Sequence, residues 1–470
     1  MRVRDINVNP PQHFGESVSD ANESIDSEAA MQAQNMRQWN DFFSDPHLLE
    51  LVEAALMHNQ ELQIINQEVL IAQNEVMAKK GEYLPSLGLS GEAGIEKVGE
   101  FTHQGATDST TEYEPGKFVP KKLHNYAIGL HLSWEVDVWK RMRNAKKAAV
   151  MRFLASKDGR NFVQTKLIAE VASSYYELLA LDAKLDIVSR NIEIFEEALD
   201  LVRAQKDAAR VTSIAVKRFE AELYKNQSRR FDLQQKIFQV ENRINLLAGR
   251  FPQTISRQTE DFINTQLDVV KEGIPSDLLR NRPDISQAER ELAAAKLDVK
   301  SARAQFFPSL SIEAHSGFES FRASHLLKPE SVFYNVMGNL TAPLLNRKGI
   351  KAAYANANAK QMQSILHYEQ KILNGFTEVV NQLRNIDNLQ NSLLLKKKQV
   401  DSLQEAVDAS VILFNAARAD YVEVLLTQRE MRDAQLELVE VKERQLVSYV
   451  TLYQALGGGW TKNSPAKPVK

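Results

Sequence analysis

Cysteine is absent from this chain of 470 residues, which excludes disulfide bonds, thiolate catalysis and zinc sites built on cysteine. No run of 18 or more apolar residues occurs, so no transmembrane helix is expected. The opening residues, MRVRDINVNPP, lack the apolar core of a signal peptide. A net charge of −3 leaves no basic excess for binding nucleic acid. Composition alone therefore favours a cytosolic, helical protein.

Proline is missing from two long stretches, between Pro120 and Pro252 and between Pro343 and Pro465. Both carry apolar residues at alternating spacings of three and four, the pattern of coiled-coil packing. The first stretch has Ile168, Val171, Tyr175, Leu178, Leu185, Val188, Ile192, Phe195, Leu199 and Val202; the second has Ile372, Phe376, Val379, Leu383, Ile386, Leu393, Val400, Leu403, Val407 and Phe414. A helix over residues 140–210 would be about 100 Å long. We predict antiparallel helical hairpins of coiled-coil type.

Four shorter segments alternate between apolar and polar residues with a period of two, as β-strands do. They cover residues 86–95, 126–138, 309–318 and 334–342. The second segment presents one face made of Ile128, Leu130, Leu132 and Trp134, and an opposite face made of His131, Ser133 and Glu135. Such strands suit a membrane β-barrel, in which the first face would contact lipid and the second the lumen or the barrel rim. A soluble hairpin packed on a core is the alternative.

The chain contains an internal duplication. Tyr83–Leu87, YLPSL, recurs as Phe306–Leu310, FFPSL, at an offset of 223, and Tyr126–Ala145 aligns with Tyr334–Ala353 at an offset of 208. The difference of 15 residues places a longer loop between the paired strands of the first repeat. Each repeat reads helix, strand, strand, very long helix, turn, helix, which indicates a domain duplication.

The duplication suggests five segments. We predict an N-terminal segment over residues 1–55, a first repeat over 56–250, a connecting segment over 251–280, a second repeat over 281–459 and a tail over 460–470. Residues 97–125 and 319–331 lack an apolar period and should form loops at the outer surface.

Four strands are too few to close a membrane barrel, because the smallest such barrels need eight. An open sheet edge in lipid leaves backbone groups unsatisfied, at a cost of several kcal/mol each. Several chains must therefore combine their strands if these span a membrane. The apolar stripes of the helices need neighbours as well. The barrel hypothesis thus predicts an oligomer.

Several motifs resemble those of a known family. The run LRNRPDI at 279–285, followed by Ala288-Glu289 and by ARAQFFPSL at 302–310, resembles the repeat motif of outer-membrane efflux channels, the TolC-like outer membrane factors. WEVDVW at 134–139 is similar to the end of their second strand, and LLTQR at 425–429 to the stretch near the periplasmic tip. The resemblance extends from about Trp39 to Trp460.

This resemblance implies a mixed α and β membrane protein. Three chains would form a homotrimer with a 12-stranded β-barrel in the outer membrane, continued by a long α-helical barrel through the periplasm. Such channels receive drugs, metal ions or proteins from an inner-membrane transporter through a periplasmic adaptor, and they perform no chemistry. We expect no enzyme activity, cofactor, metal site or nucleic-acid partner, since the sequence has no GxGxxG, Walker A or HExxH motif and no His pair at metal-ligand spacing.

The chain departs from the family pattern in two places. Most members carry a cleaved signal, and many of this subgroup carry a lipidated cysteine; because neither is present, we expect a mature or engineered form. The helix turns usually contain glycine where this chain has Ala209 and Ala417. Alanine adopts the left-handed conformation only at a cost, so we expect turns of a different shape. Gly457, Gly458 and Gly459 are interpreted as a helix stop.

The resemblance also suggests a gate and an adaptor contact. After the second turn, Ala419, Val422, Glu423 and Leu426 share a helix face by their spacing. In a trimer, Glu423 would form an acidic ring between apolar rings of Val422 and Leu426, which can block by dewetting. Ordinary packing positions with a solvated Glu423 are the alternative. Arg210 and Arg418 would lie at the exposed tips that meet the adaptor, and turns without a partner are the alternative there.

The competing hypothesis for the whole chain is a soluble coiled-coil scaffold without a pore. It explains the heptad-like spacing and the mean hydropathy of −0.36, but it assigns no role to the four alternating strands.

Overall fold

The computed structural model describes residues 39–259, 262–265, 281–416 and 418–458. Ala417, Gly459, Leu279, Arg280, Trp460, the tail and most of the predicted N-terminal and connecting segments lie outside these ranges. The described chain divides into two compact units, one made of residues 70–154 and 290–365, the other of the remaining residues. Each unit contains parts of both sequence repeats, so the spatial division cuts across the duplication.

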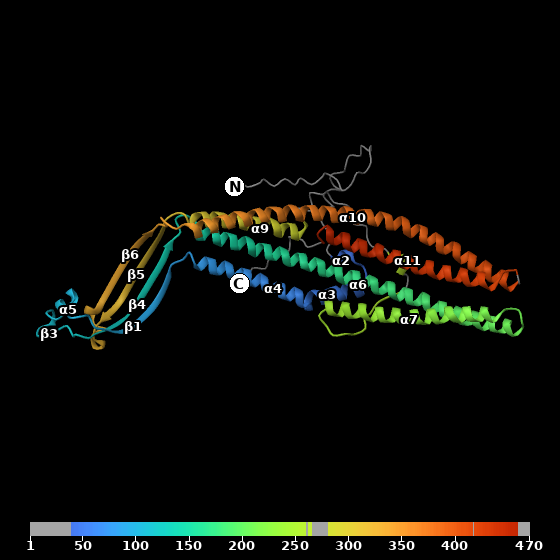
Figure 1. Ribbon diagram of the computed structural model, residues 1–470, viewed down its shortest axis with the longest axis horizontal. Helices are drawn as coiled ribbons and strands as arrows, with labels where there is room; N and C mark the ends of the chain where they lie inside the picture. The colour runs from blue at the N-terminus through green and yellow to red at the C-terminus, as the bar shows by residue number, and fades with distance from the viewer. Residues whose placement is uncertain (1–38, 260–261, 266–280, 417, 459–470) are drawn as a thin grey trace, which may run out of the picture. The chain divides into compact units, whose positions relative to one another are not determined.

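The first unit contains a four-stranded antiparallel sheet with the order β1-β4-β5-β6 (Figure 1). The strands are β1 (Ser86–Glu96), β4 (Leu123–Val136), β5 (Ser309–Ser320) and β6 (Val332–Thr341). They match the four segments with a period of two in the sequence. The pairing also confirms the duplication, because Ser86 pairs with Ser133 and Ser309 pairs with Thr341, at the offsets of 223 and 208.

The loops between paired strands differ as the sequence predicts. The β1–β4 connection covers residues 97–122 and the β5–β6 connection only 321–331, which accounts for the 15 additional residues. The longer connection has local structure of its own: α5 (His103–Asp108), β2 (Glu112–Glu114) and β3 (Lys117–Phe118). The shorter one contains the 3₁₀ turns η2 (Ala323–His325) and η3 (Pro329–Ser331).

Two very long helices form the hairpins predicted from the proline-free stretches. Helix α6 (Arg141–Asp207) has 67 residues and α10 (Lys348–Asn415) has 68, each about 100 Å long at 1.5 Å per residue. Each is followed by a 35-residue helix, α7 (Ser213–Leu247) or α11 (Tyr421–Ala455). The shorter helices are α2 (Trp39–Phe42), α3 (Pro46–His58), α4 (Gln60–Gly81), η1 (Phe262–Asn264) and α9 (Pro283–Ala304).

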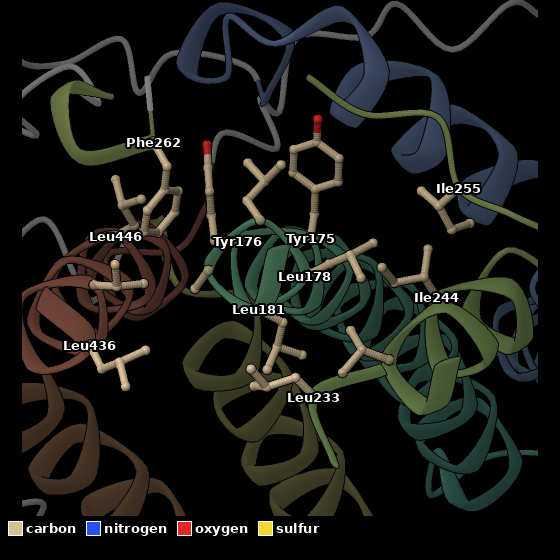
Figure 2. Close-up of a cluster of buried hydrophobic side chains, with 14 of the residues drawn as sticks. Tyr175, Tyr176, Leu178, Leu181, Leu233, Ile244, Ile255, Phe262, Leu436 and Leu446 are labelled. Atoms are coloured by element: carbon tan, nitrogen blue, oxygen red, sulfur yellow. The ribbon is translucent and has the colours of Figure 1, made fainter. Parts of the chain in front are cut away.

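The two long helices differ in how completely one chain buries their apolar stripes. In α6 the predicted stripe is buried except for Leu185, which is partly buried. Figure 2 shows Leu178 and Leu181 of this stripe region beside Ile244 and Leu233 of α7, in the same buried cluster as Leu436 and Leu446 of α11. In α10 the stripe residues from Val400 to Phe414 are only half-buried. The second hairpin therefore depends more on contacts beyond its own chain.

Glycines with left-handed backbone conformation end the second helix of each hairpin. At the end of α7, the Gly249 N–H donates to the Leu246 carbonyl (3.0 Å) and the Arg250 N–H to the Asn245 carbonyl (3.0 Å), with Gly249 at φ 67°. This is the Schellman motif, which requires a left-handed residue. Gly457 and Gly458 end α11 in the same way, as predicted.

The expectation of a differently shaped turn at Ala209 is wrong. Ala209 adopts φ 56°, its N–H donates to the Lys206 carbonyl (2.9 Å), and the Arg210 N–H donates to the Gln205 carbonyl (2.8 Å). The alanine thus completes the same Schellman motif that glycine forms elsewhere, despite a cost of about 1 kcal/mol for the left-handed conformation. None of the helices within the described ranges combines the length and apolar character needed to cross a bilayer.

Candidate functional site

One face of the sheet is apolar across all four strands. On β4, Ile128 and Leu130 are 41% and 50% exposed, and their neighbour Leu89 on β1 is 72% exposed. The other large exposed residues on this face are Leu87, Ile95, Val332, Tyr334, Val336 and Leu340. A face of this kind is unfavourable in water, because large contiguous apolar patches are rare on soluble monomers.

The two remaining residues predicted for this face are less exposed. Leu132 is half-buried between its cross-strand neighbours Leu87 and Ala314. Trp134 is also half-buried, and its indole N–H donates to the Tyr83 carbonyl at 3.2 Å. Both nevertheless belong to the apolar side of the strand, since the alternation along β4 is unbroken.

The opposite face of the sheet is polar. It carries Ser133 and Glu135 on β4, as predicted, together with Glu313 on β5 and Asn335 on β6. His131 on this face pairs directly with His315 of β5. Sequence spacing does not reveal this pairing, because only the strand register brings His315 beside His131.

Aromatic and charged residues gather where β4 and β5 adjoin the helices. The Trp139 ring stacks on Phe307 at 4.7 Å, and its N–H donates to the Pro308 carbonyl at 2.8 Å. The Arg141 guanidinium donates to both oxygens of Glu135 at 2.7 and 2.8 Å. These residues line a cavity of about 330 Å³. Sequence reasoning missed this stacked pair, although an aromatic residue close to the helix-side end of a strand, as Trp139 is after β4 and Phe307 before β5, is a usable signal for a membrane-interface position.

The same junction fixes the start of α6. The Asp137 carboxylate accepts hydrogen bonds from the Met142 N–H (3.1 Å) and the Arg143 N–H (2.8 Å). It therefore satisfies two of the donors that a helix leaves unpaired in its first turn. Lys140 supplies the change of direction between strand and helix with φ 60°.

The predicted tip residues lie at the turns between the hairpin helices. Arg210 and Arg418 are both exposed, and each donates its backbone N–H to a carbonyl five residues earlier, Gln205 (2.8 Å) or Leu413 (2.9 Å). Within the described part of the chain, neither guanidinium forms an ion pair. Both side chains are therefore free to contact a partner.

A small ion network lies near the first tip. Glu220 of α7 accepts hydrogen bonds from Lys217 (2.6 Å) and Arg203 (3.2 Å). The hydrogen bond from Lys217, and then that from Arg203, lower the pKa of this carboxyl group. The network connects α6 to α7 but leaves Arg210 outside it.

The predicted gate residues lie at the start of α11. Glu423 is exposed, Leu426 is 48% exposed and Val422 is half-buried, whereas Val424 and Leu425 point into the core. The three predicted residues thus share the helix side that faces away from their own chain. Ala419 does not belong to this face, because α11 begins at Tyr421 with Asp420 as its N-cap.

A buried arginine joins the two hairpins further along α11. Arg432 is 1% exposed, and its guanidinium donates to Asn226 (3.2 Å) and Glu222 (3.3 Å) of α7 and to Asp433 (3.0 Å). Asn226 is itself 1% exposed. A buried charge with partners on a second helix holds that helix in one register, because displacement would leave the charge unpaired.

The chain matches a known protein family over most of its length. The family model described as "Outer membrane efflux protein" matches residues 51–250 and 274–458. The pyoverdine export outer membrane protein OpmQ of Pseudomonas aeruginosa is 30% identical over 429 residues, covering 91% of this chain and 88% of that protein. The cation efflux system protein CusC of Escherichia coli K12 is 27% identical over 421 residues, covering 90% and 88%.

Solved structures share the fold. A crystal structure of CusC superposes with a TM-score of 0.83 at 24% identity and covers 96% of this chain and 97% of that one. The open state of the MtrE outer membrane channel of Neisseria gonorrhoeae gives a TM-score of 0.82 at 23% identity, covering 97% and 96%.

The contact between the hairpins can be tested by a double-mutant cycle. Replacing Arg432 by Met should destabilise the helical part by about 3 kcal/mol, because Asn226 and Glu222 lose their partner. Glu222→Gln alone should cost less, and the coupling between the two changes should exceed about 1 kcal/mol. Thermal unfolding of the detergent-solubilised protein provides the measurement. The control is Arg444→Met, at an exposed position of the same helix; additive effects of the paired changes would contradict the contact.

Proposed function

Because this chain belongs to the outer membrane efflux protein family, we propose that its apolar sheet face contacts lipid and its polar face lines a passive exit path. The chain is the outer-membrane duct of a tripartite efflux pump and forms a homotrimer. Its strands build a 12-stranded β-barrel in the outer membrane, and its helices continue as a barrel in the periplasm. A periplasmic adaptor and an inner-membrane transporter are its partners.

The open edges of the sheet are the observation that carries this proposal. Among the described strands, β1 and β6 each have a paired neighbour on one side only, although the sheet exposes an apolar face. Lipid satisfies the apolar face but cannot satisfy the backbone groups at the edges. When three copies join edge to edge, their edge strands pair with one another, and the apolar face can then lie in lipid. A soluble scaffold without a pore would leave the apolar face in water.

The cargo is proposed to be small molecules, selected by the pump and not by the duct. Relatives of similar identity carry names for chemically unrelated cargo: pyoverdine, cations, and toluene. A duct that bound one of these tightly would release it slowly, whereas conduction requires weak binding. The family consists of transport channels, and we infer that this chain catalyses no reaction.

A gate at the start of α11 is part of the proposal. Val422, Glu423 and Leu426 face away from their own chain, so in a trimer they can face the axis. Three copies of Glu423 would then concentrate negative charge and attract cations, while the rings of Val422 and Leu426 would form apolar constrictions. We also propose that Arg210 and Arg418 contact the adaptor. The two proposed repeats cover residues 56–250 and 281–459, and the segment 251–280 connects them.

The sheet orientation predicts a difference between two arginine substitutions on one strand. Leu130→Arg should cost about 2–4 kcal/mol if the residue lies at mid-membrane, because a charge enters the lipid. Ser133→Arg, on the polar face of the same strand, should cost little. Folding into lipid vesicles, followed by the heat-modifiable shift on gel electrophoresis, measures both. Equal defects would show that the faces are assigned wrongly.

The gate predicts changes in current through single channels. Val422→Ala and Leu426→Ala should raise the conductance in a planar bilayer because they widen apolar constrictions. Glu423→Gln should lower the preference for cations. Val424→Ala, on the buried side of the same turn, is the control and should leave both quantities as in the parent. If all three gate variants match the parent, the constriction lies elsewhere.

The tips predict a loss of adaptor binding without a loss of assembly. Arg210→Glu and Arg418→Glu should reduce crosslinking to the adaptor, because a glutamate would repel the adaptor surface that the arginine attracts. The trimer should persist on native gels. Arg190→Glu serves as the control, because this α6 side chain is 73% exposed but lies several turns from the tip. Crosslinking and efflux at the parental level would contradict the proposed contact.

A further inference from the structure

We propose that His131 and His315 form a binding site for a divalent transition-metal ion such as Cu²⁺, Ni²⁺ or Zn²⁺ on the polar face of the sheet. The location of this site in the lumen rests on the proposed function, which assigns the polar face to the exit path. The metal-binding geometry itself lies within one chain and does not depend on that assignment.

The two histidines are direct cross-strand neighbours. They pair in the β4–β5 register, and their rings lie 6.3 Å apart between centroids with planes inclined by 24°. Directly opposed residues have Cβ atoms about 4.5–5.5 Å apart. One ion with bonds of about 2.0–2.1 Å to an imidazole nitrogen of each residue can bridge such a gap once both side chains rotate to point these nitrogens toward it. Imidazole is a preferred ligand of copper, nickel and zinc.

A glycine provides space for the first ring. Gly88 on β1 is the cross-strand neighbour of His131 on the side away from His315. A Cβ atom at position 88 would lie 2.2 Å from Cε1 and 2.6 Å from Nε2 of His131. The ring therefore lies over the glycine, and any other residue there would displace it.

The ring nitrogens are available to a ligand. Among the described residues, neither His131 nor His315 has a hydrogen-bond or ion-pair partner for its ring nitrogens. The charged residues on this face of the four strands are all acidic: Glu92, Glu96, Glu135, Glu313 and Glu319. The absence of lysine and arginine from this face of the described strands leaves a field that favours cations.

The site is expected to bind the ion weakly, which suits a channel better than a storage site. Within the described ranges, no group of three or more histidine, cysteine or acidic residues is placed to hold a metal. Two imidazoles would therefore share the ion with water molecules, which exchange readily. Weak sites along a path allow an ion to enter and to leave again.

Calorimetric titration of the detergent-solubilised trimer with NiCl₂ tests the site. The parent should bind one ion per chain at this site, and His131→Gln or His315→Gln should each abolish that binding. His124→Gln is the matched control, because His124 is an exposed residue of the same strand that stacks on Tyr126 and lies outside the pair. Equal titration curves for the parent and the double His131→Gln/His315→Gln variant would overturn the proposal.

Bilayer recordings separate this proposal from the proposed function. Addition of Ni²⁺ should reduce the single-channel current of the parent but not of the double histidine variant. If Ni²⁺ binds to the pair without affecting the current, the luminal location is wrong, and so is the assignment of the sheet faces. A protein that does not conduct contradicts the proposed function, while the titration still decides whether the pair binds metal.

Discussion

The two unpaired edges of the β1-β4-β5-β6 sheet are the constraint on which the rest of the molecule depends. A strand edge in lipid leaves a row of backbone donors and acceptors without partners, and each costs several kcal/mol. No rearrangement of four strands removes these edges, since four strands cannot form a closed barrel. The sheet is therefore complete only when β6 of one chain pairs with β1 of another. Oligomerisation is thus part of the fold.

The helices show the same dependence on neighbouring chains. Only Leu62 is buried on α4, whereas Ile64, Ile71 and Met77 are 59–67% exposed. On α7, Tyr224, Phe231 and Phe238 follow a spacing of seven and are 55–63% exposed, which is the spacing of a coiled-coil contact. These apolar stripes contact water in the isolated chain, whereas in the oligomer they can pack against neighbouring chains. The negative mean hydropathy of the sequence hides them, because it averages each stripe with the charged side of its helix.

Periodicity made much of the fold predictable. The strands and long helices appear in the sequence because each element repeats its apolar residues with its own period over many residues. The Schellman turn at Ala209 was not predictable in this way, because the geometry depends on backbone hydrogen bonds to Gln205 and Lys206 and not on the residue type alone. The inclusion of Ala419 in the gate face is wrong for a related reason, since its spacing fits a helix that has not yet begun at that residue.

The histidine pair was unpredictable because β4 and β5 come from different repeats, and sequence spacing carries no information on such a contact. Because the chain is duplicated, each histidine has an equivalent position on another strand with which it can be compared. At the offsets of 208 and 223, the counterparts of His131 and His315 are Asn339 on β6 and Glu92 on β1. These two strands are the free edges of the sheet.

If the edge strands of adjacent chains pair as β4 and β5 do, Asn339 of one chain would face Glu92 of the next. The barrel would then alternate three histidine pairs within chains with three amide–carboxylate pairs between chains. A residue needed only to hold a strand pair together would be expected at both kinds of contact, because the duplication gives them the same backbone geometry. The histidines occur at only one kind, which favours a role in binding over a role in strand pairing.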